Sequence, residues 1–242
     1  MDFPNESAEY RAARDRLLAK EVEERRLMED VAVARRALPE GGLLKEDYLF
    51  EEVDSSGAVR KTRFSELFAP GKDTLVVYNF MFPRDPGDDR PPGTESSTRR
   101  LPLHESPCPS CVALLDQLDG AVRHVGVHLN FVVIAKTAAT NLAAFGRERG
   151  WRFLRLLSAR GNTFKRDYHG ETADGAQRPL LSVFNRTGEE IRHFWSSELL
   201  YAPTEPGQDP RHVGTLEPLW NLFDMTRQGR PVGWDEQLSY PE

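Results

Sequence analysis

The chain has 242 residues, 39% of them hydrophobic and 29% charged, and 32 Lys and Arg against 38 Asp and Glu give a formal net charge of -6. This composition can form a core, and the length favours one large domain with an appended segment. The mild acidity argues against nucleic acid as a partner, and no apolar run approaches the roughly 18 residues of a membrane span. The first residues lack the charged and apolar regions of a signal peptide, so we expect a cytoplasmic protein.

Residues 6–38 are predicted to form one long helix. Apolar side chains recur at seven-residue steps, while the other faces are dense in Arg and Glu. Pro39 and the following glycines end the pattern. We expect a helical arm over residues 1–40 that either packs along the domain or pairs two copies of the chain as a homodimer.

Residues 47–82 are predicted to hold a hairpin, a helical turn and a central strand. The hairpin spans residues 47–63 around a cluster of turn residues, and the helical turn spans residues 65–68. Residues 74–82 then form a nearly continuous run of β-branched and aromatic side chains. Such a run is typical of a strand buried on both faces, so we place it in the middle of a sheet.

Residues 83–107 differ in kind, because they hold six of the 17 prolines, charges of both signs and few apolar residues. A stretch of this length without a periodic pattern is uncommon in a compact domain unless it serves a function. We therefore expect a long, partly mobile loop inserted into the domain. It leads directly to Cys108.

The rest of the chain alternates helices and strands. In chain order we expect a helix from Cys108 to about Val125, a strand over 128–136, a helix over 138–149, a short strand over 151–157, a helical turn over 162–168, a strand over 180–184 joined by a hairpin turn to 191–195, and a closing helix over 216–225. This order predicts an α/β fold. We place the domain over residues 41–230 and a C-terminal tail over residues 231–242.

The two cysteines, Cys108 and Cys111, lie at the start of a predicted helix that follows a buried strand. No second pair exists, so a disulfide framework is excluded. A helix N-terminus offers unpaired N–H groups and the positive end of the helix dipole, and both stabilise a thiolate. Pro109 suits the first helical turn. We therefore predict that Cys108 is the exposed nucleophile of thiol–disulfide exchange and that Cys111, more buried, resolves the mixed disulfide.

Other interpretations of the cysteine pair remain open. Both residues could be inert core cysteines. They could instead hold copper or zinc together with His104 and His169, which lie in loops expected near Cys108, although a second C-x-x-C pair is absent. In a third alternative the protein is an interaction module and the dithiol is incidental. The redox interpretation implies no cofactor, whereas the metal interpretation implies copper or zinc.

Arg178 and Pro179 stand directly before the predicted strand at residues 180–184. Redox domains with a C-x-x-C at a helix start usually carry a proline, often after a cis bond, before a later strand that faces the dithiol. We therefore predict that Pro179 and Arg178 contribute to substrate binding and that the bond before Pro179 is cis. Alternatively, Pro179 only marks the start of the strand, a position where proline is tolerated.

Several segments together resemble a known family. They are the charged N-terminal helix, Lys45–Phe50, Tyr78–Phe82, Cys108–Cys111, Gly150–Trp151 and Leu181–Phe184. The order of elements resembles the thioredoxin fold, and the segments resemble the thioredoxin-like bacterial family DUF899 in its peroxiredoxin-like branch. The resemblance implies a three-layer sandwich with a central mixed β-sheet and a long N-terminal helix. It also implies a dithiol–disulfide role on a thiol or disulfide substrate, protein or small molecule.

The chain also departs from these patterns. The family's link between the central strand and the first cysteine is usually short, whereas here it spans residues 83–107. We expect this insertion to set the specificity of the protein. The position three before Cys108 is Glu105, where a peroxidase pattern has Thr or Ser, so peroxidase activity is disfavoured.

Overall fold

A computed structural model describes residues 3–93, 98, 101–226, 228 and 231–239 of the chain. The chain divides into two compact units, Met1–Gly41 and Gly42–Glu242. The second unit carries the sheet and both cysteines. Among the described residues, no helix combines the length and the hydropathy needed to cross a membrane.

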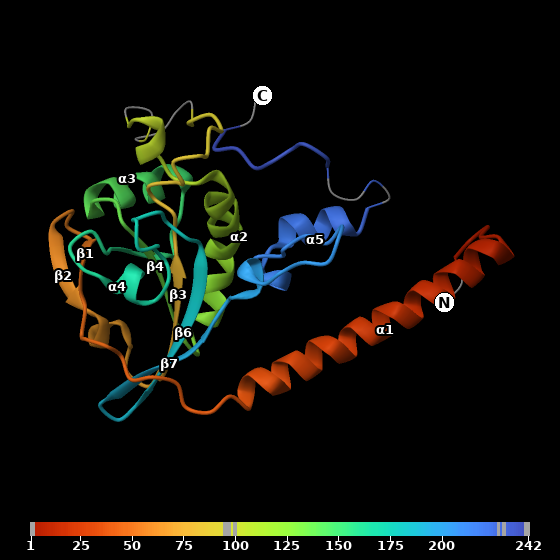
Figure 1. Ribbon diagram of the computed structural model, residues 1–242, viewed down its shortest axis with the longest axis horizontal. Helices are drawn as coiled ribbons and strands as arrows, with labels where there is room; N and C mark the ends of the chain where they lie inside the picture. Colours follow the sequence, from red (N-terminus) through yellow and green to blue (C-terminus); the bar gives the residue numbers. More distant parts are fainter. Residues whose placement is uncertain (1–2, 94–97, 99–100, 227, 229–230, 240–242) are drawn as a thin grey trace. The chain divides into compact units, whose positions relative to one another are not determined.

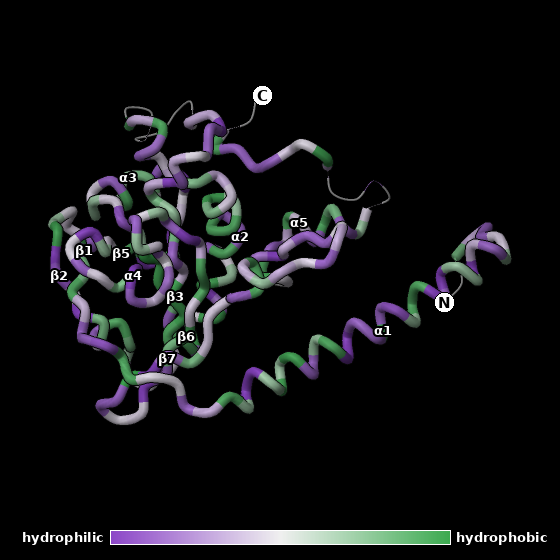
Figure 2. Tube along the Cα trace, in the orientation of Figure 1, coloured by the Kyte–Doolittle hydropathy of each residue, from purple (hydrophilic) through white to green (hydrophobic). Residues whose placement is uncertain are grey.

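The helix α1 spans Ala8–Arg36 in the first unit. It begins after Ser7, whose hydroxyl oxygen accepts the N–H of Tyr10 at 3.1 Å and so caps the first turn. The helix predicted over residues 6–38 is confirmed, and it is slightly shorter at both ends. Hydrophilic and hydrophobic residues alternate along α1, and none of its residues is buried (Figure 2). Pairing of two copies through this helix stays a prediction.

The second unit is built on one mixed seven-stranded sheet, in the order β2-β1-β5-β4-β3-β6-β7 (Figure 1). The strands are β1 (Leu49–Val53), β2 (Val59–Arg63), β3 (Thr74–Asn79), β4 (Asn130–Ala135), β5 (Arg155–Ser158), β6 (Leu180–Thr187) and β7 (Glu190–Ser196). The strands β3, β4 and β5 run parallel, and the strands on both sides of them are antiparallel to their neighbours. The predicted α/β fold with a central mixed sheet is confirmed.

Helices cover both faces of this sheet. The helices of this unit are η1 (Phe64–Leu67), η3 (Leu103–Glu105), α2 (Pro109–Val125), α3 (Ala139–Arg149), α4 (Phe164–Asp167), η4 (Leu199–Tyr201), η5 (Gly214–Leu216) and α5 (Pro218–Asp224). Of these, η1, α2, α3 and α4 contribute buried side chains to the two cores. One core packs α2 and α3 against Tyr78 and Val133, and the other packs η1 and α4 against Val77 and Ile134. Successive strand side chains point to opposite faces, so β3 and β4 contribute to both cores. The three layers match the predicted thioredoxin-like sandwich, with α2 and α4 on opposite sides of β3 (Figure 1).

Two elements differ from their predicted extents for local reasons. The strand β5 begins at Arg155 rather than at residue 151, because the carboxylate of Asp119 accepts the N–H groups of residues 152–154 and holds that segment in a turn. The predicted closing helix is the short α5, which has no buried residue, and Leu222 in it is 64% exposed. Its apolar side chains therefore do not close the core.

Two segments expected to lie outside the domain core contribute to it. In the segment 83–107, Arg84 is only 1% exposed and Ser106 is fully buried, while residues 94–97 and 99–100 lie outside the described residues. The predicted C-terminal tail also belongs to the second compact unit, because Leu238 joins the core beside α2. Leu238 is only 5% exposed, so this described residue of the predicted tail packs against the domain.

Candidate active site

The first turn of α2 holds both cysteines. Cys108 is its N-cap residue, Pro109 is its first helical residue, and Cys111 follows in the same turn. Proline suits this position because its missing N–H would have no helical partner. The N–H of Cys108 donates to the carbonyl of Met81 at 2.9 Å. The pair therefore lies where a helix start meets the chain that leaves the central strand β3.

Both cysteines are free thiols and both are buried, each with 2% of its surface exposed. The prediction of an exposed Cys108 is wrong, because Arg90 and Glu236 lie over the start of α2. Arg90 Nη2 is 3.7 Å from Cys108 Sγ, and the hydroxyl of Ser110 donates to Glu236 Oε2 at 2.9 Å. A cavity of about 350 Å³ reaches both cysteines and is their route to solutes.

The two thiols have opposite electrostatic environments. Hydrogen bonds from the Cys111 thiol and, more weakly, the Cys111 N–H and the charge of Arg90 lower the pKa of Cys108 to about 7. Burial raises the pKa of Cys111 well above its ordinary value, and the neighbouring Cys108 sulfur adds to this effect. The site thus favours a thiolate at Cys108 and a protonated thiol at Cys111.

Arg90 is held in place by residues of the proline-rich segment. The carboxylate of Asp88 accepts from Arg90 Nε at 2.9 Å and from Nη2 at 2.8 Å, and this pairing contributes to a lowered pKa of Asp88 despite its burial. Buried Arg84 donates to the carbonyl of Arg90 at 2.6 Å and lies 3.7 Å from Asp88. These residues were not predicted from the sequence, in which the charge run at residues 88–90 is their one local signal.

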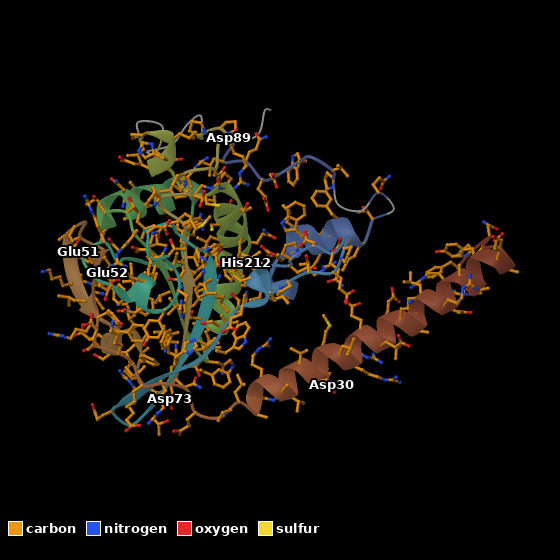
Figure 3. All side chains as sticks on the ribbon, viewed as in Figure 1. Asp30, Glu51, Glu52, Asp73, Asp89 and His212 are labelled. Atoms are coloured by element: carbon orange, nitrogen blue, oxygen red, sulfur yellow. The ribbon has the colours of Figure 1, made fainter. Side chains whose placement is uncertain are left out.

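The cavity joins the cysteines to segments that lie far apart in the sequence. Its walls include Tyr78, Pro179, His212, Trp220 and Glu236. The ring of His212, which is labelled in Figure 3, lies with its centroid 6.1 Å from that of Tyr78. Burial lowers the pKa of His212 to about 4, and its ring nitrogens have no partner among the described residues. The cavity thus offers an uncharged imidazole beside the dithiol.

Of the predicted substrate-binding residues, Pro179 lines the cavity. The exposed Arg178 instead lies 5.2 Å over the ring of Tyr201. The bond before Pro179 is not cis, since the cis bond found among the described residues joins Phe82 to Pro83. This correction follows the ordinary trans preference of X–Pro bonds.

The structure does not assemble the alternative metal site. His104 on η3 and His169 after α4 are both exposed. Within the described ranges, no group of three or more His, Cys, Asp or Glu side chains is arranged to hold a metal ion. Cys108 and Cys111 therefore stand without the two histidines that the copper or zinc interpretation requires.

Comparisons with solved structures found redox proteins at low sequence identity. The reduced Prx3 of Vibrio vulnificus in complex with hydrogen peroxide has 12% identity and a TM-score of 0.42, covering 71% of this chain and 91% of its own. Enterococcus faecalis AhpC has 8% identity and a TM-score of 0.45, and the match covers 76% of this chain and 92% of AhpC. A mutant of Xanthomonas campestris peroxiredoxin Q has 12% identity and a TM-score of 0.43, and the match covers 65% of this chain and 87% of that protein. A comparison with curated proteins found no match.

A family model gives the broadest correspondence in sequence. It matches residues 2–238 and carries the description "Bacterial protein of unknown function (DUF899)". The match includes the N-terminal helix, the proline-rich segment, the cysteine pair and Glu236. The chain therefore belongs to the DUF899 family, as its sequence segments predicted.

Proposed function

We propose that the protein is a thiol–disulfide oxidoreductase in which Cys108 is the nucleophile and Cys111 is the resolving thiol. The observation that carries this proposal is the unequal pair at the start of α2. Cys108 has a lowered pKa beside Arg90, and Cys111 has a raised pKa deeper in the site. A thiolate attacks a disulfide far better than a thiol does, so the attacking residue is Cys108.

The exchange proceeds through two displacements. The Cys108 thiolate attacks one sulfur of a substrate disulfide, an S–S bond forms between them, and the substrate's other sulfur leaves as a thiolate. Cys111 then loses its proton and attacks Cys108 Sγ, which forms the Cys108–Cys111 disulfide and releases the second substrate sulfur as a thiolate. Both leaving thiolates take up protons at neutral pH. Two electrons pass from the dithiol to the substrate, and the reverse sequence oxidises a substrate dithiol.

Trapping the mixed disulfide tests the two roles. With oxidised glutathione, Cys111→Ser is expected to accumulate one glutathionyl group on Cys108, because nothing can displace it. Cys108→Ser is expected to accumulate none at the same pH, and mass spectrometry after acid quenching measures both. An adduct on Cys111 in the second variant, with none in the first, would reverse the roles. The absence of adducts in both would refute the exchange.

Removing the cation beside Cys108 is expected to make its thiolate less stable. In a Cys111→Ser background, Arg90→Met should move the midpoint of the pH profile for alkylation of Cys108 upward by about one pH unit. Thiolate is present only above the pKa, so alkylation at neutral pH slows accordingly. Arg178→Met is the matched control. It makes the same change of side chain, but Arg178 lies over the ring of Tyr201 rather than beside Cys108. Equal midpoints in the Arg90 and control variants would contradict this electrostatic role.

The access route predicts a preference among disulfide substrates. Cys108 is buried and is reached through a cavity of about 350 Å³, a size that suits a small molecule. We expect single-turnover reaction with a small disulfide such as oxidised glutathione to be faster than with a folded protein disulfide such as insulin at equal concentration. Stopped-flow measurement of tryptophan fluorescence can follow both reactions, since Trp220 lines the cavity. A faster reaction with insulin would assign a protein substrate.

A further inference from the structure

The helix α1 carries an exposed apolar seam. None of its residues is buried, and its large seam side chains are between 47% and 65% exposed: Tyr10, Leu17, Leu27 and Val31. Together with Ala13 and Ala34 they occupy positions a and d of four successive heptads. This spacing keeps one stripe of a helix against a partner helix, as in coiled coils. Most helices gain their stability from packing such a stripe, so the seam on α1 favours a partner helix.

Two charged residues interrupt the seam at its centre. Lys20 is at position d of one heptad, Glu24 is at position a of the next, and both are exposed. Among the described residues, neither forms an ion pair within its own chain. In a parallel pair of identical helices, each seam residue faces its own copy, so Lys20 would face the partner's Lys20 and Glu24 the partner's Glu24. Like charges at the centre of an interface are unfavourable, and the parallel arrangement is therefore disfavoured.

An antiparallel pair brings opposite charges together instead. When the twofold axis passes at the level of residue 22, each position a on one helix faces a position d on the other. Lys20 then faces the partner's Glu24, and the symmetry repeats this contact with the two chains exchanged. Four charges of alternating sign therefore meet at the centre of the seam, where the parallel pair has only repulsion between equivalent residues.

The same antiparallel register also matches the sizes of the apolar side chains. The remaining layers are Leu17 with the partner's Leu27, Tyr10 with the partner's Ala34, and Val31 with the partner's Ala13. Each alanine thus receives a larger side chain. In a parallel pair Ala13 and Ala34 would each face another alanine, and the gap between them would lose packing contacts. Charge and size therefore favour the same direction and the same register.

We propose that two copies of the chain associate through α1 in an antiparallel coiled coil, with Lys20 of each helix against the partner's Glu24. A second copy is the occupant of the seam because the seam is complementary to itself in this register. The charged layer fixes direction and register rather than supplying affinity, since the cost of removing ions from water offsets most of their attraction. The interface lies in the first compact unit, whereas both cysteines lie in the second.

Charge reversal with rescue tests this pairing in the full chain. Sedimentation over a range of protein concentrations is expected to show a dimer for wild type. Lys20→Glu alone, or Glu24→Lys alone, turns both central contacts into like-charge contacts and should raise the dissociation constant of the dimer about a hundredfold. The double variant restores opposite charges and should restore the wild-type constant. Lys and Glu are both good helix formers, so α1 stays helical in every variant.

Two charge reversals on the outward face of α1 are the matched controls. Arg26→Glu and Glu29→Lys change exposed residues at heptad positions c and f, which point away from the seam. Exposed charges outside an interface contribute little, so both variants should keep the wild-type dissociation constant within about twofold.

Disulfide trapping reports the direction of the helices. In a Cys108→Ser, Cys111→Ser background, an equimolar mixture of Ala13→Cys and Val31→Cys chains is expected to form a covalent dimer on mild oxidation. Either chain alone should not, because its new cysteine faces a different residue of the partner. A parallel pair would give the opposite result, with each chain linked to its own copy.

Three results would overturn the proposal. They are a wild-type chain that is still monomeric at about 1 mM, a dimer that the single reversals leave unchanged or that the double variant does not restore, and a covalent dimer formed by Ala13→Cys chains alone. None of these measurements uses disulfide exchange at Cys108, so failure of the proposed function would leave their outcome unaffected.

Discussion

Replacing Cys108 with Ser is expected to reduce disulfide exchange to the rate of the uncatalysed reaction. A serine hydroxyl stays protonated at neutral pH even beside Arg90, so no nucleophile remains at the start of α2. Cys111 does not substitute for it, because burial keeps the Cys111 thiol protonated. Reduction of oxidised glutathione by the fully reduced protein, measured in single turnover, checks this loss.

Histidine variants provide the control for this loss of activity. His104→Ala and His169→Ala remove exposed side chains that the structure leaves outside the cysteine site, and both variants should exchange at the wild-type rate. A loss of activity in either variant that added copper or zinc restores would favour the metal interpretation. Retention of full activity by Cys108→Ser would remove the assignment of the nucleophile.

The second large effect concerns the pH dependence of folding stability. Lys165 has an ordinary pKa of 10.5 in the unfolded chain and a pKa of about 7 in the fold, because burial disfavours its charged form. Between these values the unfolded chain binds more protons, so the contribution of Lys165 to the free energy of unfolding rises with pH. Below about pH 7 both states are charged and the full penalty of burying the ammonium group remains.

Lys165→Met is therefore expected to increase the free energy of unfolding by a few kcal/mol at and below neutral pH, an advantage that shrinks as the pH approaches about 10. Denaturant titrations of wild type and variant over this pH range measure the difference, in which the contributions of other groups cancel. Lys136→Met should show no comparable change with pH, because Lys136 is partly exposed and paired with Glu171. A constant difference between Lys165→Met and wild type would contradict the lowered pKa of Lys165.

Much of the fold follows from local sequence patterns. The aromatic and β-branched run at residues 74–82 predicted β3, which lies between β4 and β6. Pro109 and the apolar spacing after it predicted α2, and the turn at Gly188 predicted the β6–β7 hairpin. These predictions succeeded because backbone preference and burial favour the same structure within a few residues.

The covering of the site could not be predicted in this way. Arg90 is fixed by Asp88, buried Arg84 and Ser110, and Glu236 reaches Ser110 from the other end of the domain. Ion pairs and hydrogen bonds between distant segments leave no periodic pattern in a sequence. The proline content of residues 83–107 predicted a loop, and the described residues of this segment hold no α-helix or β-strand. That content does not show that buried charges anchor the segment beside Cys108.

The burial of Lys165 was invisible for a related reason. A lysine in a short polar turn is usually exposed, and its position depends on how α4 docks against the sheet. The two cysteines, in contrast, stood out because their spacing and the helix start are both local. Local sequence patterns therefore pointed to the cysteine pair, whereas the charged groups around it follow only from the tertiary structure.

The central claim is that Cys108 and Cys111 form a reversible disulfide, and a redox titration tests it most directly. The protein is equilibrated in glutathione buffers of increasing oxidised fraction, quenched with acid and alkylated, and its free thiols are counted by mass spectrometry. The proposed function predicts one two-electron transition in which both thiols disappear together and no glutathione adduct remains. Thiols that stay reduced at every ratio, or adducts that form on one cysteine while the other stays free, would contradict it.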